Sequence, residues 1–241
     1  MRILALESSA KAASCCIADD GRLLAQSFQN NGLTHSRTLL PMVSDMLKNC
    51  GIAVRDVDAI AAANGPGSFT GLRIGISTAK GLAWGTGKPI CAVSALEAMA
   101  WNSGVREGLI CCVMDARRQQ VYNALFRAED AGPVRLTEDR AIALEDLFRD
   151  ARLRTDPVTL VGDGAELCCS YGLSKGGSLS LAPENLLQQS AWGVAKAALK
   201  KIREEGFEPA ADISPNYLRL SQAERERLEK QHRLPGDAKQ S

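Results

Sequence analysis

Residues 3–28 read ILALESSAKAASCCIADDGRLLAQSF, and this stretch predicts three strands joined by two short connections. The first strand is an apolar run that ends in Glu7, after which the polar loop SSAKAA leads to a second strand over residues 14–18. The Asp-Gly pair at residues 20–21 is a common hairpin turn and leads to a third strand over residues 23–28. The chain therefore begins with an antiparallel meander whose first strand ends in a carboxylate.

The same order of elements returns in the second half of the chain. An apolar run over residues 109–114 ends in Asp115, the polar loop ARRQQ follows, and a strand is predicted over residues 121–126. A Gly-Pro turn at residues 132–133 then leads to a third strand from Val134 onward. Two copies of one pattern predict two lobes that are built alike.

Helices and strands alternate after each meander. The predicted elements are helices at His35–Cys50, Gly71–Trp84, 144–149 and 183–205, and strands at 57–63, 89–93 and 158–162. Each lobe thus follows the order β-β-β-α-β-α, which predicts an α/β fold with two similar lobes, the second one reduced. We place the first lobe at residues 1–103 and the second at residues 104–220. The charge-rich residues 221–241 are predicted to form a frayed or disordered tail.

The composition is that of a folded protein with little net charge. Of the 241 residues, 45% are hydrophobic and 24% are charged, which is enough to bury a substantial core. No apolar run approaches the roughly 20 residues of a membrane-spanning helix, and the N-terminal segment lacks the pattern of a secretion signal. We therefore expect a soluble, cytoplasmic protein without membrane contact. The formal charge of +1 predicts no strong field for nucleic acid.

A duplicated lobe of this kind resembles the actin-like and sugar-kinase superfamily, in which ATP binds in the cleft between the lobes. In that superfamily an acidic residue at the end of each lobe's first strand faces phosphate and metal, and Glu7 and Asp115 occupy those positions. The resemblance implies the actin-like fold, also called the ASKHA fold. One function that it implies is a stand-alone ATP-binding kinase or ATPase that uses these two carboxylates.

Five motifs narrow the resemblance, namely ILALESS, THSRTLLPM, NGPGSFTGLRIG, AVSALEAMA and MDARRQQVY in this order. Together they resemble the bacterial TsaB family, also called YeaZ, over the first half to two thirds of the chain. This resemblance implies a non-catalytic subunit of the machinery that installs threonylcarbamoyl-adenosine beside the anticodon of tRNA. It further implies a heterodimer with the catalytic subunit TsaD, TsaE as another partner, and contact with tRNA mainly through the complex. A homodimer of the isolated chain is left open.

The positions that hold a metal in TsaD carry other residues in this chain. The resemblance implies that TsaD has its ligands as His-x-x-x-His after a strand, and the corresponding positions here are Ala95 and Met99. A methyl group and a thioether do not suit a hard or borderline divalent cation. The chain has only two histidines, His35 and His232, which are far apart in sequence. We therefore predict no metal site, no catalytic residue and no peptidase activity, and we interpret His35 as structural.

The glycine-rich loop NGPGSFTGLRIG, residues 64–75, looks like a phosphate cradle but fits neither common form. A Walker A loop has four residues between its glycines followed by Lys-Ser or Lys-Thr, and a dinucleotide fingerprint has a third glycine where Thr70 stands here. The loop is either a shaped connector or a weak anion site that uses backbone amides. The candidate nucleotide or phosphate residues are Glu7, Ser8, Ser9, Gly67, Ser68 and Asp115. We predict no tightly bound cofactor, with ATP held only weakly or together with a partner.

Two helices carry a candidate partner surface. An interior glycine costs a helix about 1 kcal/mol relative to alanine, so several glycines in the second helix indicate that another backbone approaches closely. The first helix has a wide apolar stripe that exceeds what one sheet face requires. The predicted interface consists of Leu39, Leu40, Val43, Met46 and Leu47 with Gly71, Ile74, Gly75, Thr78, Ala79 and Leu82. The alternative is that these residues belong to the core.

The last motif outside the tail is SPNYLRL, residues 214–220. Its residues Pro215, Tyr217 and Arg219 are predicted to pin the C-terminal segment to the body of the protein.

Overall fold

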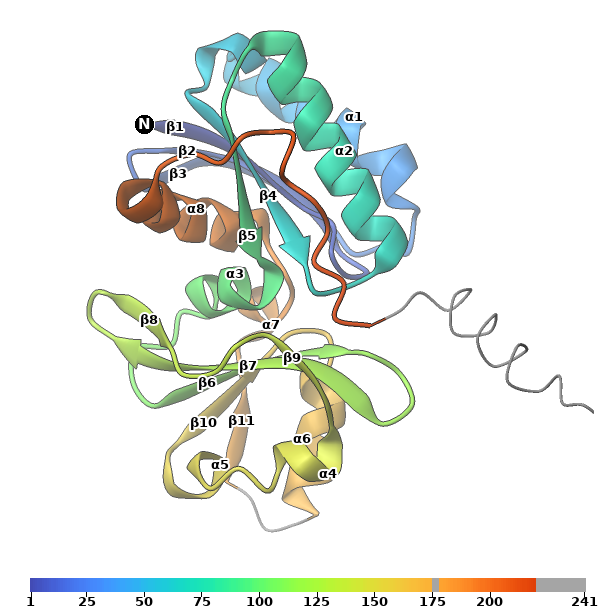
Figure 1. Cartoon of the computed structure of the whole chain (residues 1–241), viewed down its shortest axis with the longest axis vertical. Coiled ribbons are helices and arrows are strands. Elements are labelled where there is room, and N and C mark those ends of the chain that lie inside the picture. Colours follow the sequence, from blue (N-terminus) through green and yellow to red (C-terminus); the bar gives the residue numbers. More distant parts are fainter. Residues whose placement is uncertain (175–177, 220–241) are drawn as a thin grey trace, which may run out of the picture.

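The structure is a computed structural model that describes residues 1–174 and 178–219 (Figure 1). Two lobes follow one another along the long axis of the molecule, and each is built on its own sheet. The predicted tail at residues 221–241 and His232 lie outside the described residues. Among the helices of the described part, none has the length and apolar character that crossing a membrane requires.

The first lobe contains, within the described residues, a five-stranded sheet in the order β3-β2-β1-β4-β5. Its strands are β1 (Arg2–Glu7), β2 (Ala13–Asp19), β3 (Arg22–Gln29), β4 (Ala59–Gly65) and β5 (Ile90–Ser94). The first three strands are antiparallel, whereas β4 and β5 run parallel to β1. Successive side chains of β1 point to opposite faces of the sheet. Ile3 and Ala5 belong to one hydrophobic cluster, and Leu4 and Leu6 belong to another. The sheet therefore needs cover on both faces.

Two pairs of helices provide this cover. α1 (His35–Cys50) and α2 (Phe69–Thr86) lie over one face, and α3 (Ala95–Asn102) and α8 (Ala191–Glu205) lie over the other (Figure 1). A short 3-10 turn, η1 (Val54–Asp56), precedes β4. The loops that connect the strands to these helices meet at one end of the sheet, where the second lobe begins.

The second lobe contains, as far as the structure describes it, a six-stranded sheet in the order β11-β10-β6-β7-β8, with β9 pairing with β7. Its strands are β6 (Leu109–Asp115), β7 (Gln120–Glu129), β8 (Gly132–Arg135), β9 (Arg140–Ala143), β10 (Val158–Val161) and β11 (Leu179–Leu181). Its helices are α4 (Leu144–Leu147), α5 (Arg152–Thr155), α6 (Ala165–Leu173) and α7 (Glu184–Leu187). β6 pairs antiparallel with β7 and parallel with β10, as β1 does with β2 and β4. The predicted duplicated α/β fold is confirmed.

One long predicted helix is divided in the structure. The stretch at residues 183–205 forms α7 and α8 with a break between them, because Gln188 leaves the helical conformation. The hydroxyl of Ser190 then accepts a hydrogen bond from the Trp192 N–H and caps the start of α8. The elements that the sequence patterns did not predict are η1, α3, α5, α6, β9 and β11, all of nine residues or fewer.

The C-terminal part of the chain returns to the first lobe. α8 packs against β1, β2, β4 and β5 and against α3. The predicted second lobe at residues 104–220 includes α8, whereas the observed second lobe ends at α7. Residues 109–187 thus form a lobe that is inserted between α3 and α8 of the first.

The apolar stripe of α1 belongs to the core. Leu39, Val43, Met46 and Leu47 are at most 6% exposed. The prediction that these four side chains supply a partner surface is wrong, because α1 has to cover β2 and β3 and to contact α2 at the same time. Contacts with β2, β3 and α2 together bury the full width of the apolar stripe. Of the predicted α1 residues only Leu40 is exposed, at 51%.

Gly71 and Gly75 allow α2 to approach the loop between β1 and β2. A Cβ atom at Gly71 would lie 2.1 Å from the Ser8 carbonyl oxygen, and one at Gly75 would lie 2.2 Å from Ser8 Oγ. The prediction that another backbone approaches this helix is confirmed, but that backbone belongs to the same chain. Gly71, Gly75 and the buried Ala79 are therefore packing residues rather than partner contacts. The other predicted residues of α2 are partly exposed and stay a prediction: Ile74, Thr78 and Leu82.

We expect Gly71→Ala to destabilise the protein by about 1–3 kcal/mol, because the new methyl group would displace the Ser8 backbone. Gly81→Ala is the matched control in the same helix, where a Cβ meets nothing within 4 Å. It should stabilise the protein by up to about 1 kcal/mol through helix propensity. Urea unfolding of both variants measures the difference, and equal effects would contradict the packing role of Gly71.

Candidate functional site between the lobes

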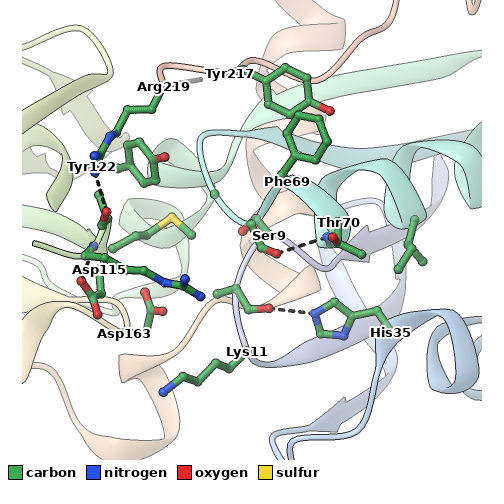
Figure 2. A pocket seen from close by; sticks show the side chains of 18 of the residues that line it. Ser9, Lys11, His35, Phe69, Thr70, Asp115, Tyr122, Asp163, Tyr217 and Arg219 are labelled. Atoms are coloured by element: carbon green, nitrogen blue, oxygen red, sulfur yellow. Dashed lines mark hydrogen bonds between the residues drawn. The ribbon is translucent and has the colours of Figure 1, made fainter. Parts of the chain in front are cut away.

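A cleft of about 810 Å³ lies between the lobes, where the β1–β2 loop, the start of α2 and the end of β6 come together (Figure 2). The first lobe lines it mainly with Ser9, Ala10, Lys11, Thr34, His35, Gly67, Ser68, Phe69 and Thr70. The second lobe contributes Met114, Asp115, Arg117, Tyr122 and Asp163. Residues 216–219 close one side. The cleft corresponds in position to the ATP site that the superfamily resemblance implies.

Glu7 ends β1 directly behind this cleft and is completely buried. Its Oε1 accepts a hydrogen bond from the Ser9 N–H at 2.6 Å, whereas its Oε2 has no hydrogen-bond partner. Burial raises the pKa of Glu7 to about 7, because the loss of water outweighs the hydrogen bonds from Ser9 and Ser8. Near neutral pH the side chain is therefore divided between its charged and neutral forms, whereas a ligand for a phosphate-bound metal ion would have to be charged.

The carboxylates of the second lobe lie in different surroundings. Asp115, the counterpart of Glu7, is exposed at the end of β6 and accepts from the Arg117 N–H at 2.7 Å. Asp163 follows β10, is partly buried, and accepts from Gln189 Nε2 at 3.1 Å. Burial raises the pKa of Asp163 above its usual range. Figure 2 shows Asp115 and Asp163 side by side on the second-lobe wall.

The glycine-rich loop uses its backbone donors within the chain. The Ser68 N–H donates to the Ser9 carbonyl oxygen at 2.7 Å, and Ser68 Oγ accepts from the Gly71 N–H at 3.3 Å as the cap of α2. A Cβ atom at Gly67 would lie 2.3 Å from the same Ser9 oxygen. Of the two interpretations, an anion site that uses the Ser68 amide does not fit this conformation, because that N–H is already bonded to Ser9. In this conformation the loop is the shaped connector of the alternative interpretation.

Several buried polar atoms around the cleft have no hydrogen-bond partner, namely Ser9 Oγ, His35 Nδ1 and Gln189 Oε1. His35 Nε2 lies 2.7 Å from the Ala10 carbonyl oxygen, so in the neutral ring Nε2 carries the proton and Nδ1 is an acceptor. This contact ties the start of α1 to the β1–β2 loop, which confirms the structural role of His35. His35 Nδ1 and Gln189 Oε1 are acceptors and suit hydrogen-bond donors, whereas the Ser9 hydroxyl can donate as well as accept.

The structure brings together only part of the predicted phosphate site. Ser9, Gly67, Ser68 and Asp115 line the cleft, whereas Glu7 and Ser8 lie behind it. Ser8 Oγ donates to the Gly71 carbonyl oxygen at 2.9 Å and so serves packing. The cleft residues that were not among the predicted phosphate-site residues include Lys11, Phe69 and Asp163. Asp163 follows an apolar strand as Glu7 does, and that pattern is the signal that could have revealed it.

The positions that correspond to metal ligands in TsaD are closed to solvent. Ala95 and Met99 of α3 are fully buried in the hydrophobic cluster that joins α3 to α8 and the second sheet. Within residues 1–174 and 178–219, no group of three or more His, Cys, Asp or Glu side chains is arranged to hold a metal ion. Positions 95 and 99 therefore offer a metal neither a suitable ligand nor access.

Comparison with known proteins places this architecture in a family. The family model described as TsaD, tRNA N6-adenosine threonylcarbamoyltransferase, matches residues 29–226. The tRNA threonylcarbamoyladenosine biosynthesis protein TsaB of Bacillus subtilis is 32% identical over 237 residues, which are 96% of this chain and 100% of that protein. Its namesake in Escherichia coli is 32% identical over 91% of this chain and 95% of its own length. The structure of YeaZ from Pseudomonas aeruginosa superposes with a TM-score of 0.73 at 27% identity, and the match covers 90% of this chain and 99% of that one.

The family model and the fold together define a protein of the TsaD type that is built from two similar lobes. The relatives that match over nearly their full lengths are TsaB or YeaZ proteins. The chain therefore belongs to the TsaB family, also called YeaZ. The resemblance carried by the five motifs is confirmed. The similarity covers nearly the whole chain and so extends beyond the part in which the motifs lie.

Glu7→Gln should make the protein more stable than the wild type at pH 8 but not at pH 5. The pKa of Glu7 is raised in the folded state from its ordinary value near 4.5 to about 7. The stability that the neutral carboxyl provides is therefore fully present below pH 4.5 and is lost as the pH rises through 7. Glutamine stays neutral, so the variant should gain up to about 3 kcal/mol across this range.

Urea unfolding at both pH values measures this gain. Asp115→Asn removes a carboxylate from an exposed position of the same cleft and is the control. Parallel pH profiles for Glu7→Gln and the wild type would contradict the burial argument.

Proposed function

We propose that this chain is a non-catalytic subunit required for threonylcarbamoyl-adenosine modification of tRNA next to the anticodon. It acts in the cytoplasm as a scaffold and activator of the catalytic subunit TsaD, with which it forms a heterodimer, and TsaE is a further partner. The observation that carries the proposal is the similarity to Bacillus subtilis TsaB over 96% of this chain and all of that protein. A match over both full lengths indicates that neither lobe has been replaced.

The surroundings of the cleft and of α3 support a non-catalytic role. Ala95 and Met99 stand at the metal-ligand positions, and both are buried. Glu7 is only partly charged near neutral pH, and the Ser68 N–H is bonded to Ser9. We propose no tightly bound cofactor, and ATP is held weakly or only together with a partner. Contact with tRNA occurs mainly through the complex, because a formal charge of +1 neutralises few phosphates.

The exposed face of α2 supports the heterodimer. Trp84 is 91% exposed, and a Cβ at Gly81 or Gly85 beside it would meet nothing within 4 Å. Tryptophan is enriched among residues that dominate binding energy at interfaces, and an almost bare indole ring is unusual on a solvated helix. Leu40 of α1 is also exposed. The proposed partner surface is thus the outer face of α1 and α2 around Leu40 and Trp84, with Ile74, Thr78 and Leu82 at its margin.

Reconstitution of the modification tests the proposed function. A mixture of TsaD, TsaE, tRNA and the threonylcarbamoyl-adenylate donor should form the modified nucleoside when this chain is added. Without it, the initial rate of modification, measured by mass spectrometry of digested tRNA, should fall at least about tenfold. An equal rate in the absence of this chain would refute a required subunit.

Trp84→Ala should weaken binding to TsaD by about 10- to 100-fold while the melting temperature stays within about 2 °C of the wild type, because the ring makes little contact within the chain. Leu24→Ala is the control, since Leu24 is an exposed apolar residue of β3, 46% exposed and outside the proposed surface. Calorimetric titration and thermal melting give the two readouts. Met46→Glu, in contrast, should unfold the chain, because Met46 is a core residue. Undiminished affinity of folded Trp84→Ala would remove Trp84 from the interface.

The second candidate function, an independent kinase or ATPase, is favoured by the size of the cleft and by the acidic residues around it. It predicts ATP turnover by the purified chain in the range of typical enzymes, about 1 to 10³ per second. Our proposal predicts a rate far below this range with ATP and magnesium. Turnover within it, abolished by Asp115→Asn, would favour the enzyme instead.

A further inference from the structure

Residues 207–219 form a strap that leaves α8 and runs over the first lobe to the cleft, drawn in orange-red in Figure 1. Near its start, Glu208 forms a β-bridge with Ile90 at the edge of β5. Halfway along, Lys80 of α2 donates to the Ala211 carbonyl oxygen at 3.3 Å, and Ile213 enters the hydrophobic cluster under α1 and α2. The strap thus covers one edge of the first sheet and follows α2 toward the second lobe.

The end of the strap joins the two lobes. The Tyr217 ring stacks on Phe69 at the start of α2 with a centroid distance of 4.5 Å, and Arg73 Nε donates to the Tyr217 hydroxyl at 2.9 Å. Two residues later, the Arg219 guanidinium donates to the Ala116 carbonyl oxygen, which belongs to the loop after β6 (Figure 2). These contacts confirm that Tyr217 and Arg219 pin the C-terminal segment, and they show that it is pinned to both lobes.

The strap also divides the space between the lobes. Asn216 donates from its N–H to the Asn64 carbonyl oxygen at 2.6 Å, and its own carbonyl oxygen lies so close to Gly65 that a Cβ there would be 2.5 Å away. Asn216 lines the cleft described above and also a second cleft of about 480 Å³, to which Ser94, Arg135 and Asp139 contribute. The backbone around Asn216 is therefore a wall between two clefts.

The loop that Arg219 contacts has an unfavourable backbone. Three consecutive non-glycine residues have positive φ angles, namely Arg117 at 62°, Arg118 at 55° and Gln119 at 58°. Such conformations persist only where the surroundings hold them. The hydrogen bond from Arg219 to Ala116 is one of the contacts that hold this loop against the rest of the protein.

The strap itself is lightly attached. In residues 207–219 only Ile213 is buried, at 3% exposed, and the other residues are exposed or half-exposed. Segments with few buried apolar contacts open locally at a lower free energy than the core. The end of the strap can therefore detach while both sheets stay folded.

We propose that residues 207–219 are a releasable latch that holds the start of α2 to the loop at residues 116–119 and keeps the two clefts separate. When Tyr217 and Arg219 are in place, the loop is fixed and the cleft has a closed side. When they are released, the loop relaxes and the two clefts become continuous. The latch is a property of the isolated chain and does not depend on the proposed function.

Hydrogen exchange on the full chain, followed by mass spectrometry, tests the latch. Tyr217→Ala removes the ring that stacks on Phe69 and should speed exchange about 3- to 10-fold at residues 216–218 and also at residues 116–120, where the amides of Ala116 and Gln120 are hydrogen-bonded within the loop. Tyr217→Phe is the matched control, because it keeps the stacking ring and loses only the hydroxyl that Arg73 contacts. It should stay within about twofold of the wild type in the loop.

Arg219→Gln provides a second test that leaves the aromatic stack intact. It should speed exchange at residues 116–120 and leave the bridge between Glu208 and Ile90 unchanged. If Tyr217→Ala loses the fold, as judged by circular dichroism, Arg219→Gln decides alone. Wild-type exchange at residues 116–120 in Arg219→Gln, or in a folded Tyr217→Ala whose strap exchanges faster, would overturn the proposal.

Discussion

The close contact between the start of α2 and the loop after β1 is the constraint on which the rest of the first lobe depends. Only residues without side chains at positions 67 and 71 allow the Ser9 and Ser8 carbonyl oxygens to come so near. Once they do, the Ser68 N–H bonds to Ser9, and the Ser9 N–H is directed back to Glu7. The same contact therefore shapes the cleft, buries the carboxylate behind it and removes a donor from any anion that enters.

This arrangement is poorly suited to binding a metal-bound phosphate between the two lobes. In both lobes an apolar strand ends in a carboxylate, but Glu7 is buried and Asp115 is exposed. A pair of carboxylates in such unequal surroundings does not present a symmetrical clamp to a metal-bound phosphate. Both lobes and the cleft between them are present, but on the first-lobe side Glu7 is buried and the Ser68 N–H is already hydrogen-bonded.

The periodic parts of the sequence predicted the fold well, because strands β1 to β5 and helices α1 and α2 each carry a clear apolar pattern. The first helix was placed with both of its ends at the observed residues, His35 and Cys50. Burial was harder to predict. Met46 and Trp84 are both large apolar residues on helices, yet one is 6% and the other 91% exposed. Periodicity shows which side of a helix is apolar, but it does not show how many neighbours compete for that side.

The site was only partly predictable for a related reason. Asn216 and Arg219 reach the cleft from the far end of the chain, and no local pattern in the sequence links them to Asn64 or Ala116. These contacts depend on where α8 ends, because that position sets the path of residues 207–219. The motifs located the loops that line the cleft and indicated that residues 214–220 are pinned to the body, but the structure was needed to show that this segment contacts both lobes.

The insertion of the second lobe between α3 and α8 also has a consequence for synthesis on the ribosome. Residues 109–187 can complete their own sheet as soon as they emerge, but the first sheet must wait for α8 to cover the face that carries Ile3, Ala5 and Ala61. Until then a nascent chain leaves this apolar face exposed to solvent. The first lobe is thus synthesised first but completed last. Between the synthesis of its sheet and the docking of α8, the nascent protein is most prone to aggregation.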